Sequence, residues 1–68
     1  MKNKKSVQDV LNQLKKLKNM KSALYYSVIN DLEEMANGGD AGTVRQDIYK
    51  GYPDSFFQEV LSKLNQDN

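Results

Sequence analysis

A stripe of apolar residues, spaced three and four positions apart, runs along the first half of the chain. Its members are Val7, Val10, Leu11, Leu14, Leu17, Leu24, Val28, Leu32 and Met35. This spacing places them on one face of an α-helix. Ser6 followed by Asp9 resembles a capping box, which would begin the helix. The pattern predicts a helix to about Ala36, about 45 Å long at 1.5 Å per residue.

The stripe is interrupted at Asn19, Met20 and Lys21. One continuous helix is the favoured interpretation, because neither glycine nor proline occurs before Ala36. The alternative is a kink or a short break at the interruption. Ser22 would then cap a second helical segment.

Asn37, Gly38 and Gly39 predict the end of this helix, because glycine adopts the left-handed conformation without a steric cost. We therefore expect a helical hairpin that turns at residues 38–41. Thr43 and Gln46 again have the spacing of a capping box. They predict a second helix, whose apolar residues would be Val44, Ile48 and Tyr49.

Gly51 and Pro53 interrupt that second helix, and proline is well tolerated at the first position of a new one. A short third helix is predicted from about Pro53 to Leu64, with an apolar face made of Phe56, Phe57, Val60, Leu61 and Leu64. No useful length of sequence alternates with a period of two, so we predict no sheet. The expected fold is a single all-α domain over residues 1–68.

Composition excludes most kinds of catalytic and metal site. The 68 residues include no cysteine and no histidine, so the usual zinc, haem and general-base ligands are missing. The candidate nucleophiles Ser6, Ser22, Ser27, Ser55 and Ser62 have no histidine to activate them. We expect no enzyme activity, no cofactor and no metal. A core this small is marginal by itself, which favours a partner.

The sequence also bears on location. It has no run of about twenty apolar residues, and its first ten residues, MKNKKSVQDV, lack the apolar segment of a secretory signal. We expect a cytoplasmic protein.

Charge is divided unequally along the chain. Residues 1–22 contain seven lysines against Asp9 alone, whereas residues 23–68 contain three basic and eight acidic side chains. A lysine-rich amphipathic helix can bind nucleic acid or an anionic membrane surface. Arg45 is the only arginine, which argues against nucleic acid, and the apolar face must be buried in a hairpin, which argues against a membrane. Part of the lysine charge could instead pair with the third helix, near Glu59.

The six aromatic residues occur as three close pairs: Tyr25 with Tyr26, Tyr49 with Tyr52, and Phe56 with Phe57. Neighbours on a helix point about 100° apart, so we expect at least one member of each pair to stay at the surface. Exposed aromatic side chains are typical of binding hot spots. The expected binding surface consists of Tyr25, Tyr26, Phe57 and Leu61, with Lys15, Lys16 and Lys18 as a charged rim.

The segment LEEMANGGDA, residues 32–41, resembles the turn of the small E-type co-chaperones of bacterial type III secretion needle subunits. The resemblance implies a helical hairpin around the Gly-Gly-Asp-Ala turn. It also implies a co-chaperone that, together with a helical-repeat chaperone, keeps the needle subunit from polymerising.

Two other segments are similar to the Hha/YmoA group of nucleoid-protein modulators. They are SVQDVLNQLKKLKNMKSAL near the start and DIYKGYPDSFFQEV near the end. A third interpretation, independent of any family, is a phage or plasmid inhibitor of a host protein. In all three, the partner is a protein, in a heteromeric complex or by self-association. We expect no small-molecule substrate.

Overall fold

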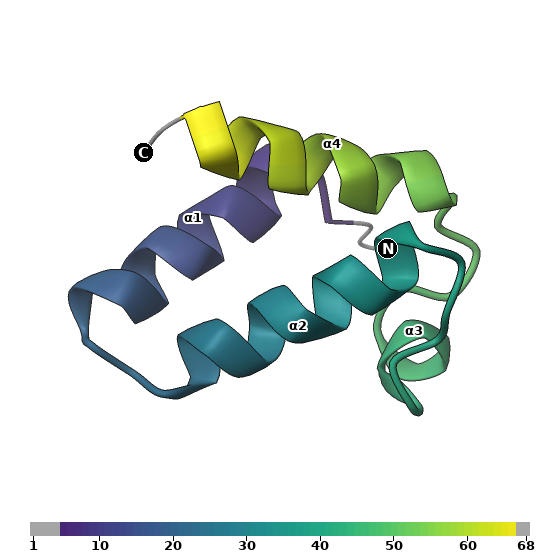
Figure 1. The fold of residues 1–68 in the computed structure, drawn as a ribbon, viewed down its shortest axis with the longest axis horizontal. Coiled ribbons are helices and arrows are strands. Elements are labelled where there is room, and N and C mark those ends of the chain that lie inside the picture. The colour runs from purple at the N-terminus through teal and green to yellow at the C-terminus, as the bar shows by residue number, and fades with distance from the viewer. Residues whose placement is uncertain (1–4, 67–68) are drawn as a thin grey trace.

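The computed structural model describes residues 5–66, which form four helices and contain no strand. They are α1 (Val7–Asn19), α2 (Leu24–Ala36), the short α3 (Val44–Asp47) and α4 (Asp54–Gln66) (Figure 1). The predicted all-α fold, with a helical hairpin and a C-terminal helix, is confirmed. Lys2 and Lys4, two of the seven N-terminal lysines, lie outside the described residues.

Helix α1 begins with the predicted capping box. The Ser6 hydroxyl accepts a hydrogen bond from the Asp9 amide at 3.1 Å, and the Asp9 carboxylate accepts one from the Ser6 amide at 3.0 Å. Two of the amides that have no partner within the first turn are satisfied in this way.

The first helical region is broken, so the favoured continuous helix is wrong and the alternative of a short break is confirmed, with Ala23 rather than Ser22 at the N-cap of α2. Helix α1 ends in a Schellman motif: the amide of Lys21 donates to the carbonyl of Lys18, and that of Ser22 to the carbonyl of Leu17, each at 3.0 Å. Lys21 has a φ of 55°, although it is not glycine. The Ser22 hydroxyl accepts from the Leu24 amide at 3.2 Å, just before α2 begins.

Helix α2 ends where the glycines predict. Gly38 has a φ of 92°, its amide donates to the carbonyl of Met35, and the Gly39 amide donates to the carbonyl of Glu34 at 2.8 Å. This is a second Schellman motif, with glycine in the left-handed position. The chain reverses here as expected.

The segment after the turn differs from the prediction. Helix α3 has only four residues, and the side chain of Thr43 makes no capping hydrogen bond. Asp40 instead accepts from the Gly42 amide at 3.1 Å, which folds the loop on itself. The return helix that packs on α2 is therefore α4, which begins one residue later than predicted and extends two residues further.

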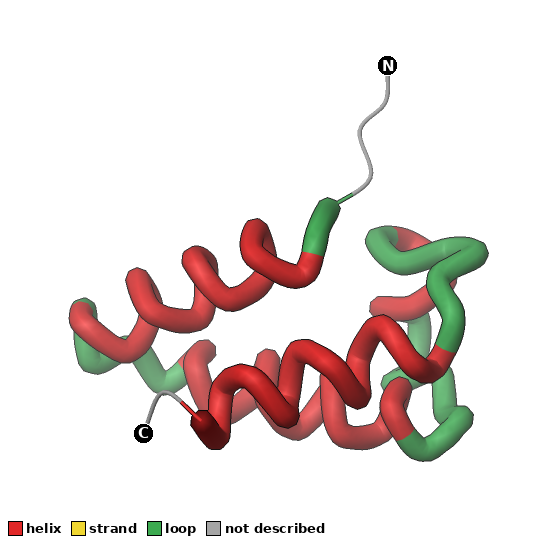
Figure 2. Tube along the Cα trace, turned by 90° about the horizontal axis from the view of Figure 1, so that it is seen from above, coloured by secondary structure: helices red, strands yellow, loops and turns green. Residues whose placement is uncertain are grey.

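The three long helices pack against one another, and the most extensive contact is between α2 and α4. Helix α2 runs antiparallel to both α1 and α4 (Figure 1). Figure 2 shows that α3 and its loops gather at the end of the molecule opposite the turn between α1 and α2.

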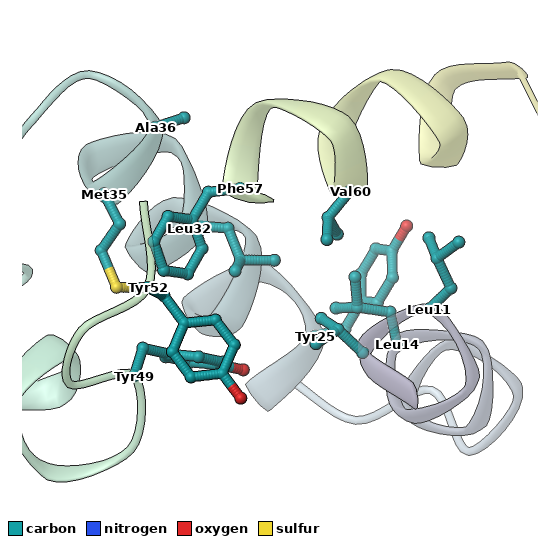
Figure 3. Packing of buried hydrophobic residues seen from close by; sticks show 11 residues of the cluster. Leu11, Leu14, Tyr25, Leu32, Met35, Ala36, Tyr49, Tyr52, Phe57 and Val60 are labelled. Carbon is teal, nitrogen blue, oxygen red and sulfur yellow. The ribbon is translucent and has the colours of Figure 1, made fainter. Parts of the chain in front are cut away.

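The core contains the expected apolar stripe and most of the aromatic residues. Its buried members are Val10, Leu11, Leu14, Tyr25, Leu32, Met35, Ala36, Tyr49, Tyr52, Phe57 and Val60. In Figure 3, Phe57 lies beside Leu32 beneath α4, while Tyr25 lies beside Leu14 and closer to α1. Leu24, which was predicted to pack on the rest, is 61% exposed, because the break before α2 turns it away from the core.

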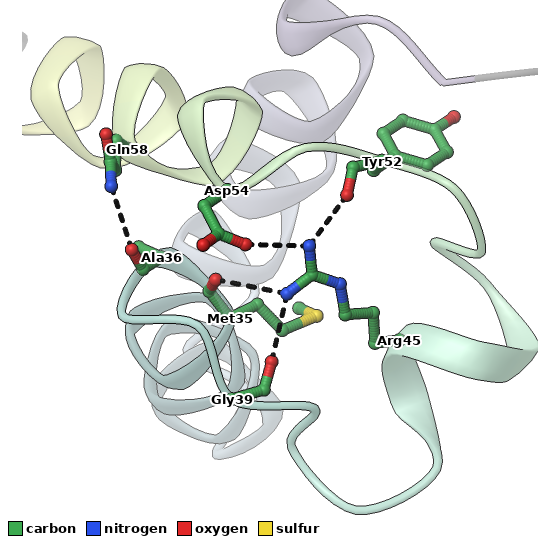
Figure 4. A network of polar contacts seen from close by, with 7 residues as sticks. All are labelled: Met35, Ala36, Gly39, Arg45, Tyr52, Asp54 and Gln58. Carbon is green, nitrogen blue, oxygen red and sulfur yellow. Dashed lines mark hydrogen bonds and ion pairs between the residues drawn. The ribbon is translucent and has the colours of Figure 1, made fainter.

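Arg45 joins three segments at the α3 end. Its Nη2 donates to the Tyr52 carbonyl and to Asp54 Oδ1, both at 2.7 Å, and its Nη1 donates to the carbonyls of Gly39 at 3.1 Å and Met35 at 3.5 Å (Figure 4). The guanidinium also lies 5.4 Å from the centre of the Phe57 ring. A single side chain thus connects the end of α2 to the start of α4.

Two further contacts close this end of the molecule. Gln58 Nε2 donates to the Ala36 carbonyl at 2.9 Å, which supplies another donor to the last turn of α2. The Tyr52 hydroxyl accepts a hydrogen bond from the backbone amide of Lys5 and donates one to the backbone carbonyl of Lys5 at 3.2 Å. The segment before α1 is therefore tied to the segment before α4.

Candidate functional site

Large exposed apolar side chains gather at the turn between α1 and α2. Met20 is 64% exposed, Leu24 is 61% exposed and Tyr26 is 74% exposed. With Lys21 they form what we call the α1–α2 corner. The fourth large exposed apolar residue, Ile48, lies just after α3 at the opposite end. Among the described residues, three of the large exposed apolar side chains therefore lie within one turn of the chain, whereas Ile48 lies at the other end.

The backbone at the corner accounts for this exposure. The left-handed conformation of Lys21 reverses the chain within a few residues. Met20 is the C-cap of α1 and Leu24 is the first residue of α2, so both lie where the two helices separate. Side chains at such a position have few neighbours from either helix.

Tyr25 and Tyr26 divide between core and surface, as the spacing of the pair predicts. Their rings meet edge to face, with centres 5.2 Å apart and planes at 82°. Tyr25 is 9% exposed and anchors the start of α2 in the core, whereas Tyr26 points outward. An ordered ring thus supports an exposed one, which reduces the freedom that Tyr26 would lose on binding.

Two hollows lie beside this pair. One, of about 410 Å³, is at the corner and is lined by Lys18, Lys21, Ser22, Ala23, Tyr25 and Tyr26. The other, of about 210 Å³, lies between α1 and the C-terminal half of α4, and its apolar lining is Leu11, Leu14, Tyr25 and Leu64. Both hollows share Tyr25 and Lys18, so they are adjacent parts of one surface.

The predicted lysine rim lies on this surface. Lys15, Lys16 and Lys18 are all exposed on α1, and Lys15 and Lys18 line the groove against α4. Lys16 and Lys18 also occupy the last turn of α1, where a positive charge interacts favourably with the negative end of the helix dipole. Lys21, which was not included in the predicted rim, belongs to it by position. Glu59, which was considered as a partner for these lysines, forms its ion pair with Lys63 at 3.4 Å.

Two expectations about the aromatic residues are wrong. Phe57 is fully buried, so it belongs to the core and not to a surface. Tyr49 and Tyr52 are both buried, although we expected one of them at the surface. They lie in the irregular segment after α3, so the 100° rotation between helical neighbours does not apply, and both rings pack edge to face against each other.

Leu61 and Phe56 have intermediate positions. Both are partly buried and pack on the core from α4. Of the four predicted apolar contact residues, Tyr26 alone is thus largely exposed. Met20 and Leu24 were not predicted as surface residues. The available signal was the interruption of the stripe beside them.

The site offers contact area and charge rather than a set of reacting groups. The residues that the structure describes include no group of three or more His, Cys, Asp or Glu side chains placed to hold a metal ion. Within residues 5–66, no helix has both the length and the apolar composition that a membrane crossing requires. Away from this surface, burial raises the pKa of Tyr49, and the neighbouring Tyr52 raises it further.

Comparisons with known proteins give no family or relative to which this surface can be related. No protein-family model matches the sequence, and searches of the curated proteins and of the solved structures found no significant match.

Proposed function

We propose that the chain is a non-enzymatic protein-binding module whose contact surface is the α1–α2 corner. The observation that carries this proposal is the exposure of Met20, Leu24 and Tyr26, each more than half exposed within seven residues of sequence around one turn. Single exposed apolar residues are ordinary on a protein surface, so the concentration of three of them around one turn is what favours an interaction site.

The chemistry of the corner suits a protein interface. Tyrosine is enriched among residues that dominate binding energy, and methionine is enriched in interfaces generally. Covering apolar surface contributes about 25 cal/mol for each Å² removed from water. The exposed lysines beside the corner would accelerate association with a partner of opposite charge.

The narrower interpretations stay predictions. A co-chaperone of needle subunits, a nucleoid-protein modulator and a phage or plasmid inhibitor each act by binding another protein. The proposed module is what they have in common. The co-chaperone resemblance implies a helical hairpin around the Gly-Gly-Asp-Ala turn, but the helix that follows this turn, α3, has only four residues. This difference gives no reason to favour that interpretation over the others.

The proposal can be tested by quantitative affinity purification from cells that express the chain naturally. The baits would be the wild type, Tyr26→Ala and Leu24→Ser, with Ile48→Ser as the matched control, because Ile48 is 53% exposed but lies away from the corner. Circular dichroism would establish that every bait is folded. A partner retained by the control and lost from both corner variants supports the proposal.

For a partner identified in this way, Tyr26→Ala should weaken binding by about 1 kcal/mol or more, roughly a fivefold increase in Kd. Equal retention of the partner by the wild type and both corner variants would contradict the proposal. So would loss of the partner from the Ile48→Ser control alone.

A further inference from the structure

The two hollows beside Tyr25 have the same sign of charge. Every charged side chain that lines them is a lysine: Lys15 and Lys18 in the groove, and Lys18 and Lys21 at the corner. The sequence from Val10 to Asn30 contains no aspartate or glutamate. The third hollow, near α3, has mixed charge, with Lys5 and Asp31 in its lining. A consistently positive lining is therefore particular to the surface around α1.

The floor of the groove is apolar. Leu11, Leu14 and Tyr25 are buried at its base, and Leu64 of α4 forms the opposite side. Its volume of about 210 Å³ lies below the roughly 300 to 1,000 Å³ of pockets that take small molecules. A groove of this size suits apolar side chains projecting from a polypeptide.

We infer that this surface, the groove together with the α1–α2 corner, binds an acidic segment of the partner protein. Apolar side chains of that segment lie in the groove over Tyr25 and Leu64, and its carboxylates face Lys15 and Lys21. This inference rests on the proposed function and deepens it by specifying the chemistry of the partner.

Other polyanions fit these observations less well. The phosphate backbone of a nucleic acid is polar, so it would make no favourable contact with the apolar floor of the groove. Arg45, the chain's only arginine, forms an ion pair with Asp54 at the other end of the molecule. A flat anionic bilayer would cover the corner, but it would not enter the groove between α1 and α4. A polypeptide with alternating acidic and apolar side chains uses both features.

An unbiased peptide library tests the chemistry directly. Phage that display random 16-residue peptides would be selected on the wild-type chain at low ionic strength. The selected peptides would then be titrated against Lys15→Glu and against Lys50→Glu. Lys50 is exposed and lies outside the surface, so the control makes the same charge change elsewhere.

The expected result is a set of peptides enriched in Asp and Glu together with aromatic or aliphatic residues. Their Kd should rise at least tenfold for Lys15→Glu and less than twofold for Lys50→Glu. Backbone amide shifts on binding should concentrate in α1, in Tyr25 and Tyr26, and near Leu64. Selected peptides without acidic enrichment, equal effects of the two variants, or shifts centred on α3 would overturn the inference, and so would the absence of any selected peptide.

Two additional ligands test whether the surface prefers a membrane or a nucleic acid to an acidic peptide. Vesicles containing phosphatidylserine and a short duplex DNA would be titrated against the same variants. Binding to either that is tighter than to the selected peptides, and that Lys15→Glu weakens, would overturn the inference in favour of a membrane or nucleic acid.

Failure of the inference is distinguishable from failure of the proposed function. If the corner variants lose a native protein partner but the selected peptides show no acidic enrichment, the proposed binding function is supported and the inferred acidic segment is wrong. If the variants retain the native partner while acidic peptides bind the groove, the corner is wrong and the groove alone is the site.

Discussion

The two ends of the molecule are built from the same kinds of residue in opposite arrangements. At the α3 end, Tyr49, Tyr52 and Phe57 are buried, and Arg45 donates to four acceptors. At the α1–α2 corner, Tyr26 points outward beside exposed lysines. Aromatic and basic side chains therefore stabilise the fold at one end and remain accessible at the other.

This contrast shows that an excess of aromatic residues does not by itself identify a binding surface. The α3 end has no regular element longer than four residues between α2 and α4, so it needs side chains to hold its loops. The corner is a short turn whose backbone hydrogen bonds are already satisfied by a Schellman motif. Side chains there are not required for closure and are available for contact.

The largest expected difference between the ends is in the effect of removing an aromatic ring. Phe57→Ala should cost about 3 to 5 kcal/mol, because it leaves a cavity beneath α4 and removes the ring under Arg45. A domain of this size has a free energy of unfolding of about 3 to 10 kcal/mol. Urea unfolding followed by circular dichroism should show a free energy of unfolding lower by this amount, which unfolds the variant at 25 °C if the wild-type value lies at the low end of the range.

Tyr26→Ala provides the matched measurement at the corner. Its free energy of unfolding, measured in urea, should stay within about 1 kcal/mol of the wild type, because the side chain is 74% exposed. Equal destabilisation by the two variants would remove the contrast between the ends.

Arg45 provides the next largest effect. Arg45→Ala should lower the free energy of unfolding by about 2 kcal/mol, because three backbone carbonyls and Asp54 lose a charged donor. Arg45→Lys keeps the charge but not the planar fork, so it should recover only part of the loss. Asp54→Asn should cost less than Arg45→Ala, because the Asp54 side chain is 47% exposed and water can replace its partner. If Asp54→Asn lowers the free energy of unfolding more than Arg45→Ala does, the ion pair contributes more to stability than the hydrogen bonds from Arg45 to the carbonyls.

The C-terminal ends of α1 and α2 sharpen the comparison further, because substitutions at their left-handed residues should change the free energy of unfolding in opposite directions. Gly38→Ala places a Cβ in the left-handed region, at φ 92°, and should destabilise by about 1 to 2 kcal/mol. Lys21→Gly relieves the same strain at φ 55° and should stabilise by up to about 1 kcal/mol. Urea unfolding of both variants measures the two effects, and destabilisation by Lys21→Gly would mean that its side chain contributes to the fold.

The smallest expected effect concerns alkaline pH. Burial, and then the neighbouring Tyr52, raise the pKa of Tyr49, so its phenol stays protonated in the folded state where it would ionise in the unfolded state. The stability due to this group is complete below its unfolded pKa of about 10, and it is lost as pH rises through the folded pKa. Thermal unfolding between pH 8 and 11 should decline less steeply for Tyr49→Phe than for the wild type. Identical slopes would show that Tyr49 does not contribute.

Local patterns predicted much of the fold. The capping box of Ser6 and Asp9, the helix end at Gly38 and the start of α4 near Pro53 each depend on residues close in sequence, and all three are confirmed. The break before α2 was harder to predict, because a lysine adopts the left-handed position that usually indicates glycine. The short α3 depends on Arg45, whose partners lie six to ten residues away, so no local pattern specified it.

The candidate site was predicted only in part. The exposure of the three rim lysines agrees with the structure, and so does the expectation that at least one of Tyr25 and Tyr26 stays at the surface. Which of the two points outward was not predicted, and Tyr25, named as a binding residue, is buried. Phe57 was misplaced because the choice between two adjacent phenylalanines depends on the register of α4 against α2. Met20 and Leu24 are exposed because of where the helices separate, which is a property of tertiary packing.

The hydrogen bonds between Tyr52 and Lys5 bear on how the protein is made. They join residues 47 positions apart, so the segment before α1 has no partner for them until Tyr52 has been synthesised. Phe57 and Val60, which complete the core over α2, emerge from the ribosome later still. Helix α1 is therefore synthesised before the residues of α4 that cover its apolar face, and the core is complete only after α4 has emerged from the ribosome.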